Sequence, residues 1–287
     1  GLLVYEASKF FTLTAPLLDV QGETATIVEF FTNDAWSLQG PELGVMPLVS
    51  ATLMVTFGAG LIAIPLGVGT ALYLSEYASE SARSYLKPAL EILAGIPSII
   101  YGIFAVAYIT PALDAFVEIE GLFNIASACV VVGIMILPMV ASVSEDAMQA
   151  VPDDLRQAGY GMGATKYEVS TGIVVPAAIS GIFSSFILAL SRAIGETMAV
   201  TLATGSLARE FAPGELSSYL QLFNPDSYLE PGMTMTAAMV QLLTGDITGG
   251  GLEYRSLFAV GLVLFVITLG MNVLSDLIAR RYQEDYQ

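Results

Sequence analysis

Four long stretches of this chain contain no charged residue. They cover residues 43–75, 92–113, 121–144 and 256–275, which are 33, 22, 24 and 20 residues long. An α-helix rises about 1.5 Å per residue, and the hydrocarbon core of a bilayer is about 30 Å thick. Each stretch is therefore long enough to cross a membrane as a helix. Because charges are costly in hydrocarbon, the pattern predicts an integral membrane protein with helical spans.

The composition agrees with this prediction and excludes other classes. Only 13% of the residues are charged, whereas soluble domains carry about a quarter. The 27 acidic residues outnumber the 10 basic ones, which excludes nucleic acid as a partner, since phosphate backbones require basic neutralisation. One cysteine and no histidine exclude a disulfide framework and predict no metal site.

A fifth apolar stretch runs over 169–208 and is interrupted only by Arg192 and Glu196. We interpret it as one span that carries two functional charges. The sequence thus predicts an all-α membrane protein with five complete transmembrane helices, near 46–74, 89–113, 122–143, 172–203 and 256–279.

The ends of the chain suggest three parts. The chain begins with Gly1 and a short apolar run, which we interpret as the end of a truncated first span, so that the complete protein would have six. The predicted parts are a remnant of that span with an extracytoplasmic segment (1–44), a transmembrane domain (45–280) and a cytoplasmic tail (281–287).

Basic residues predict the orientation, because they accumulate on the cytoplasmic side of membrane spans. One side of the predicted topology carries six of them and the other carries three. The first side, which includes the loop of about 144–171 and the C-terminus, is therefore predicted to be cytoplasmic in a plasma membrane. The opposite side includes an extracytoplasmic segment of about 204–254, whose uncharged patch 231–245 we expect to form a helix at the membrane surface. The cytoplasmic set is Arg83, Lys87, Arg156, Lys166, Arg280 and Arg281, and the opposite set is Lys9, Arg209 and Arg255.

The loop of about 144–171 predicts a compact pair of short helices. Ser144, followed by two acids, suits a helix start. Pro152 followed by two aspartates suits a second start, because acids stabilise the positive end of a helix. Three glycines then permit a turn, at positions 159, 161 and 163. Such a protrusion is suited to being gripped by another protein.

The same loop resembles the EAA motif of ABC importer permeases. The matching residues are Gln157-Ala158-Gly159, Gly163, Ile173 and Val175-Pro176, with Gln, Gly and Val standing where the family has Glu, Ala and Leu. The resemblance implies the MetI-like permease fold of ABC importers. It also implies a cytoplasmic ATPase dimer that grips the loop. ATP and Mg would then bind to that partner, and this chain itself would carry no cofactor.

Arg192 and Glu196 lie inside the fourth complete span, near 172–203, four residues apart, between Ser191 and Thr197. On a continuous helix this spacing places them on one face, where they can pair. A charge inside a membrane span is a functional candidate, and a guanidinium matches an oxyanion well. These four residues are the predicted substrate pathway. A purely structural salt bridge to a neighbouring helix is the alternative.

The segment Arg192-Ala-Ile-Gly-Glu-Thr-Met-Ala-Val200 resembles the signature of permeases of phosphate-specific (Pst) ABC transporters, in particular the PstC type. Further similar blocks occur in order at 73–78, 87–102, 133–138 and 144–147. The resemblance implies a permease subunit that imports inorganic phosphate together with a second, PstA-like permease, an ATPase dimer and an extracytoplasmic phosphate-binding protein. It also implies that Arg192 and Glu196 are functionally important.

Two smaller features remain open from the sequence. Pro97 and Ser98 interrupt a span, either as a hinge or as a static kink. Glu91, near the predicted cytoplasmic end of its span, is either functional or simply interfacial.

The sequence is also compatible with other transport functions. An ABC permease for sulfate or molybdate has the same architecture. A secondary transporter would use Arg192 and Glu196 as an ion-coupling relay, and a purely structural subunit would need neither. An ATPase is excluded for this chain because no glycine-rich loop is followed by the Lys-Ser/Thr of a P-loop. The predicted chain is therefore not an enzyme.

Overall fold

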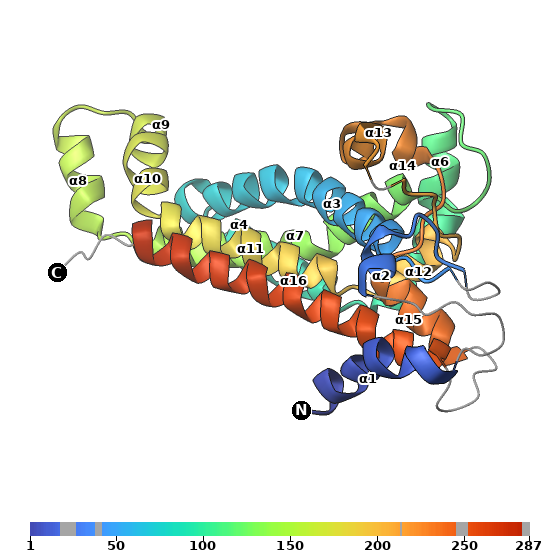
Figure 1. Ribbon diagram of the computed structural model, residues 1–287. Coiled ribbons are helices and arrows are strands. Elements are labelled where there is room, and N and C mark those ends of the chain that lie inside the picture. The colour runs from blue at the N-terminus through green and yellow to red at the C-terminus, as the bar shows by residue number, and fades with distance from the viewer. Residues whose placement is uncertain (18–26, 38–41, 213, 245–251, 283–287) are drawn as a thin grey trace. The chain divides into compact units, whose positions relative to one another are not determined.

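The computed structural model describes residues 1–17, 27–37, 42–212, 214–244 and 252–282, and these residues are mainly helical (Figure 1). An isolated bridge between Trp36 and Leu43 is the only β-type pairing in those ranges. The short helices outside the spans are α1 (Leu2–Leu17), α2 (Ile27–Thr32), α13 (Leu216–Tyr219), η4 (Leu220–Phe223), α14 (Asp226–Leu229) and α15 (Met235–Thr244).

Within the described residues, three helices are long and apolar enough to cross a membrane unbroken. They are α3 (Met46–Leu72), which a π-helical turn η1 (Tyr73–Tyr77) extends, α7 (Ile125–Gln149) and α16 (Leu252–Tyr282). Two further bent pairs of helices pass the same test together, which gives up to five spans. The all-α fold and the approximate number of spans predicted from the uncharged stretches are thus confirmed.

Two of the predicted continuous spans are wrong in detail, because each is broken. In place of 89–113, α4 (Glu80–Gly95) ends before Ile96 and Pro97, and a new helix starts at Ser98 as α5 (Ser98–Phe104), η2 (Ala105–Ile109) and α6 (Thr110–Asp114). In place of 172–203, the chain forms three helical pieces. The first comprises α9 (Lys166–Val169), η3 (Ser170–Val174) and α10 (Val175–Ala177), the second is α11 (Ile179–Ile194) and the third is α12 (Met198–Thr204). The first two pieces are bent by 68°.

The chain folds into two compact units. The first comprises Gly1–Gly58, Ser98–Val132 and Ile194–Thr268, and the second comprises Ala59–Pro97, Gly133–Ala193 and Leu269–Gln287. In the first unit the core contains Phe10, Phe30, Leu48, Met235 and Val260, all 1% exposed or less.

Helix α15 confirms the helix predicted in the uncharged patch and shows that one of its faces is buried. The uncharged patch 231–245 was expected to form a helix at the membrane surface. A helix does form there, but Met235, Ala238 and Leu242 are buried in the core. The backbone N–H of Met235 donates to Thr52 Oγ1 of α3 at 3.0 Å. The patch is therefore apolar because it packs inside the protein.

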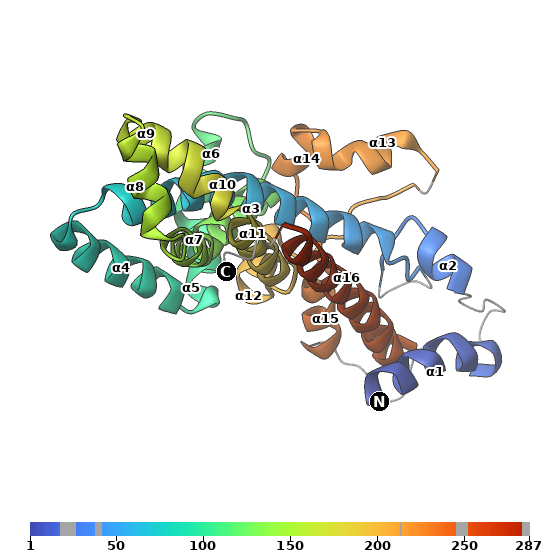
Figure 2. The same ribbon diagram turned by 90° about the vertical axis from the view of Figure 1, so that its left-hand side faces the viewer.

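The core of the second unit fixes the loop between α7 and α11. Met148, Val151, Val169, Val174 and Ile182 form one buried cluster. Because Val169 and Val174 belong to α9 and η3, this cluster attaches the loop to the ends of the long helices. Figures 1 and 2 show α8 (Asp153–Gly161) beside α9 and α10 as a hairpin of short helices.

Helices α3 and α7 approach each other closely in the second unit because glycines line their contact. A Cβ on Gly67 would lie 2.7 Å from Val140 Cβ, and one on Gly133 would lie 3.2 Å from the backbone oxygen of Ala59 and from Ile62 Cβ. Small residues allow such approach between membrane helices. We call this contact the α3–α7 seam.

Candidate functional site

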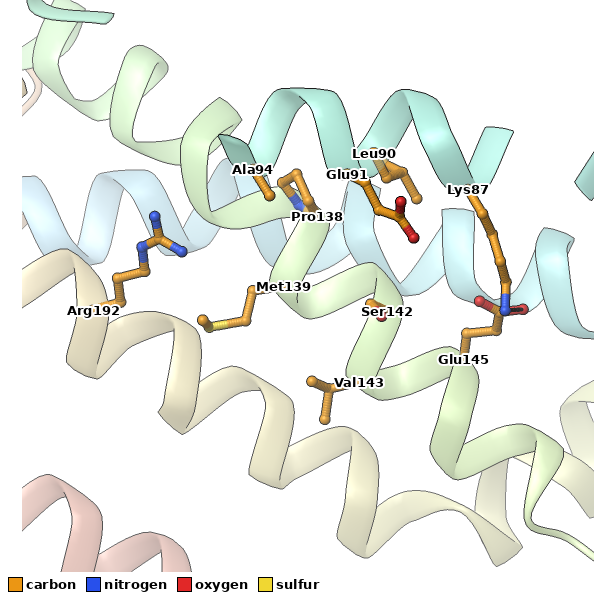
Figure 3. Close-up of a pocket in the computed structure, with 10 residues that line it drawn as sticks. All are labelled: Lys87, Leu90, Glu91, Ala94, Pro138, Met139, Ser142, Val143, Glu145 and Arg192. Atoms are coloured by element: carbon orange, nitrogen blue, oxygen red, sulfur yellow. Dashed lines mark ion pairs between the residues drawn. The ribbon is translucent and has the colours of Figure 1, made fainter. Parts of the chain in front are cut away.

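Arg192 lies in the last turn of α11 and reaches into a cavity of the second unit with a volume of about 380 Å³. Three helices surround the cavity: Arg192 enters from α11, one group of residues from α4 and another from α7 (Figure 3). The α4 group is Lys87, Leu90, Glu91 and Ala94, and the α7 group is Pro138, Met139, Ser142, Val143 and Glu145. The Arg192 side chain, which the sequence predicts to meet a substrate, thus lines a cavity that could hold one.

The predicted continuous helix through Arg192 and Glu196 is wrong. Helix α11 ends at Ile194, and α12 begins only at Met198, so no continuous helix joins the two residues. The break begins at Gly195. Glycine destabilises a helix because its backbone loses more conformational entropy on ordering than that of any other residue. Within its own unit, in the residues described there, Arg192 forms no ion pair, and its side chain is exposed to the cavity.

Glu196 and Thr197 occupy the start of α12. Glu196 Oε1 accepts a hydrogen bond from the backbone N–H of Ala199 at 3.2 Å, and its backbone oxygen accepts one from Thr236 Oγ1 at 2.8 Å. Thr197 is the N-cap residue of α12, and its hydroxyl donates to the backbone oxygen of Gly195. Glu196 thus satisfies a free N–H at a helix start, where a carboxylate is favoured.

Ser191 faces a neighbouring helix. Its hydroxyl donates to Asn272 Oδ1 of α16 at 3.1 Å. Of the four predicted pathway residues, Arg192 alone lines the cavity.

The cavity contains three charged residues that sequence reasoning did not place there. Lys87 Nζ lies 3.0 Å from Glu145 Oε1, and the Glu145 side chain is only 2% exposed. Arg83 Nε lies 3.9 Å from the same oxygen, and Gln149 Nε2 donates to it at 2.6 Å. Glu91 also lines the cavity.

Two signals in the sequence pointed to this cluster. Glu145 closes an uncharged stretch, and Lys87 is one of only three lysines in the chain. The sequence predicts a helix start at Ser144-Glu145-Asp146. That start is wrong: α7 runs through these residues to Gln149.

Local sequence explains the geometry of the loop. Helix α8 starts after Pro152 with Asp153 and Asp154 in its first turn, which confirms the predicted start. Gly163 has a φ of +85°, a conformation that favours glycine, and it permits the predicted turn. Thr165 and Glu168 then form a reciprocal capping box at α9. The N–H and hydroxyl of Thr165 donate to Glu168 and lower the pKa of its carboxyl group.

The predicted loop residues divide into a buried position and exposed ones. Gly159 is buried, and a Cβ there would lie 2.6 Å from Ile173 Cδ1 and 3.0 Å from Val169 Cγ2. Gln157, Ala158, Gly163 and Pro176 are exposed. Gly159 and Ile173, both part of the EAA-like pattern, are therefore in mutual contact.

Three large side chains at the tip of the loop were missed by the sequence reasoning. Met162 is 89% exposed, Tyr167 is 69% exposed and Tyr160 is 44% exposed. They flank Gly163 on either side, which was the available signal. The loop thus presents apolar and aromatic groups to its surroundings.

Arg156 ties this loop to the rest of the second unit. Its guanidinium lies 3.1 Å from Glu76 Oε1 of η1 and 3.2 Å from Asp153 Oδ1. It also donates to the backbone oxygens of Met148 and Val151. Arg156 and Glu76 are mostly buried, so the pair is shielded from solvent.

No group of three or more acidic, cysteine or histidine side chains that could hold a metal ion occurs among the residues that the structure describes. The charged groups of the cavity are two cations and two carboxylates, which are Arg192, Lys87, Glu91 and Glu145. Together with the Ser142 hydroxyl they offer both hydrogen-bond donors and acceptors to a small polar solute.

The chain is similar to a known family of transport proteins. Residues 63–284 match the family model described as "Binding-protein-dependent transport system inner membrane component". The chain is 34% identical to the phosphate transport system permease protein PstC of Mesorhizobium japonicum over 83% of this chain and 74% of that protein. It is 31% identical to the probable ABC transporter permease protein YqgH of Bacillus subtilis, over 84% and 74% respectively.

Solved structures show the same fold. A bacterial ABC transporter for the import of alginate matches with a TM-score of 0.59 at 16% identity, covering 99% of this chain and 94% of that one. The methionine ABC transporter MetNI in an inward-facing conformation matches with a TM-score of 0.57 at 18% identity, covering 83% and 95%. Together with the family match, these similarities show that the chain has an ABC importer permease fold and belongs to the binding-protein-dependent transport system inner membrane component family.

Proposed function

We propose that this chain is a transmembrane permease subunit of an ATP-driven inorganic phosphate importer and forms the translocation pathway with a second permease. Its relatives include PstC permeases from Mesorhizobium japonicum, Xylella fastidiosa and Haemophilus influenzae, which are 34%, 33% and 31% identical to it. The structural observation that carries the proposal is Arg192, a cation without an ion pair in its described unit, exposed in a cavity between apolar helices.

Arg192 would bind the phosphate during its passage. A guanidinium offers planar, paired donors to an oxyanion and stays charged at any physiological pH. Glu91 lines the same cavity and could accept a hydrogen bond from a phosphate oxygen that still carries a proton. Fully deprotonated sulfate cannot donate that bond, so a carboxylate in the cavity favours phosphate.

The remaining three predicted pathway residues do not line the cavity. Glu196 and Thr197 determine where α12 starts, and Ser191 attaches α11 to α16 beside Arg192. We therefore assign these three residues to the shape of the pathway, and we assign direct contact with the anion to Arg192.

The α8–α9 hairpin would dock into the ATPase dimer. It is held rigidly by Gly159 and Arg156 and exposes Tyr160, Met162 and Tyr167 at its tip. Binding of ATP and Mg by the ATPases would then move the hairpin. The basic flanking residues favour a cytoplasmic position for this hairpin and for the C-terminus. In this proposal a phosphate-binding protein would dock on the opposite side of the membrane.

Phosphate uptake by the complete complex in proteoliposomes tests this function. The complex comprises this chain, a PstA-like permease, the ATPase dimer and the binding protein. We expect Arg192→Ala to reduce uptake at least tenfold, because a charge-assisted hydrogen bond contributes about 1.5–3 kcal/mol. Ser184→Ala, on the same helix but not among the residues that line the cavity, is the control and should retain most of the activity.

Wild-type uptake by the Arg192→Ala complex would contradict the role of Arg192. Competition by sulfate or molybdate at concentrations similar to phosphate would contradict phosphate as the substrate and favour a permease for another oxyanion.

A further inference from the structure

The cavity contains a second cation, Lys87, which no role assigned above uses. Lys87 belongs to α4 and Arg192 to α11, and Figure 3 shows the two side chains at opposite ends of the group that lines the cavity. The Lys87 side chain is 39% exposed, although it contacts a Glu145 side chain that is only 2% exposed. Its ammonium group is therefore accessible from the cavity.

Glu145 has three polar partners, two of which are cations. Lys87 lies 3.0 Å from it, Arg83 lies 3.9 Å from it, and the Gln149 amide donates to it at 2.6 Å. A buried carboxylate left without a partner is strongly unfavourable. Here Arg83 and Gln149 remain in place if Lys87 moves away, so Lys87 is the partner that Glu145 can release.

Arg83 and Lys87, the two cations beside Glu145, differ in their freedom to move. Arg83 donates to the backbone oxygens of Leu74 and Ser75 and does not line the cavity, so it is fixed at the end of η1. Among the described residues, Glu145 is the only acidic side chain paired with Lys87, whose long flexible stem can reorient. Lys87 also lies in the segment that the basic flanking residues assign to the cytoplasmic side.

We infer that Lys87 is a second anion-binding residue of the pathway, which receives phosphate from Arg192 on the cytoplasmic side and is held by Glu145 when no anion is present. This inference rests on the proposed phosphate transport. The exchange involves no covalent step: the ammonium group leaves the carboxylate for the phosphate and returns when the phosphate departs. Glu145 thus competes with the anion, which keeps binding at Lys87 weak enough for release.

Uptake kinetics of the complete complex test the inference. We expect Lys87→Gln to lower the maximal uptake rate about tenfold, with the phosphate concentration for half-maximal uptake changed less than about twofold, because Lys87 acts after external capture. Lys87→Arg should restore most of the rate. The matched control is the double variant Lys87→Gln/Glu145→Gln, which removes the buried carboxylate together with its cation. It should stay as impaired as Lys87→Gln, because the ammonium group that binds phosphate is still missing.

A charge-restoring experiment separates anion binding from structure. Lys87→Cys should be impaired, and an aminoethyl methanethiosulfonate reagent, which adds a cation to the thiol, should restore uptake, whereas the neutral methyl reagent should not. The one native cysteine, Cys129, is buried, and the wild-type complex treated with both reagents reports effects on the other subunits. Inorganic phosphate should slow the reaction at position 87.

The outcomes are distinguishable. Restoration of uptake in the Lys87→Gln/Glu145→Gln double variant, or by the neutral reagent, would show that Lys87 only neutralises Glu145 and would overturn the inference. Normal uptake by Lys87→Gln beside a loss in Arg192→Ala would overturn it while leaving the proposed function intact. Absence of phosphate uptake by the wild-type complex would instead contradict the proposed function itself.

Discussion

At the scale of single residues, Arg156 makes the largest set of polar contacts in the loop. It joins the first turn of α8 to Glu76 at the end of η1 and to two backbone oxygens near the end of α7. Arg156 therefore connects the hairpin to two long helices, α7 and α3 with its extension η1. The position of Arg156 in the loop was evident from the sequence, but its partner Glu76 is 80 residues away and only the fold brings them together.

Arg156→Ala should uncouple the hairpin from η1. Removing one partner of a mostly buried pair leaves Glu76 with a hydrogen bond from the Ser75 hydroxyl but without its cation, which costs about 3 kcal/mol. We expect a lower unfolding temperature in detergent and a greater loss of uptake than of ATP hydrolysis by the complex. Asp153→Asn is the control, because Asp153 is 84% exposed and its bond with Arg156 contributes about 0.5 kcal/mol. Similar losses in both variants would contradict the role of the Arg156–Glu76 pair.

At the scale of elements, α8 depends on a glycine that allows it to pack against η3. A Cβ at Gly159 would meet Ile173 and Val169, whereas one at Gly161, two residues later on the same helix, would meet nothing within 4 Å. We expect Gly159→Val to displace α8, costing about 1–3 kcal/mol through overpacking, and to reduce ATPase retention during purification. Gly161→Ala should leave retention unchanged, and a matching loss in that control would refute the packing argument.

Hydropathy predicted the spans well and their interruptions poorly. An uncharged run shows that a segment can be buried in lipid, but it contains no information on whether the helix continues through Pro97 or Gly195. The helical spacing of Arg192 and Glu196 failed for that reason, while the prediction of Arg192 itself rested on residue type and led to the cavity. Lys87, Glu91 and Glu145 come from α4 and α7, and their meeting required tertiary packing that no local pattern contains.

At the scale of the whole molecule, the energy source distinguishes the remaining classes. A permease whose hairpin docks on an ATPase dimer should transport only when ATP is hydrolysed. We expect uptake into proteoliposomes to stop when the ATPases carry a substitution that blocks hydrolysis and to continue when ionophores collapse the ion gradients. Uptake that persists without hydrolysis and follows an ion gradient would favour the secondary transporter.

The α3–α7 seam has a mechanical consequence for that cycle. Gly67 and Gly133 bring the helix backbones so close that side chains such as Val140 and Ile62 interlock with the opposite helix. Interlocked helices resist sliding along each other, so within the second unit the two can be displaced only together. Arg156 attaches to both of them, at η1 and at the end of α7. Movement of the hairpin would then tilt α3 and α7 together. The distance between α7 and α11 across the cavity would change, while the register between α3 and α7 would stay the same.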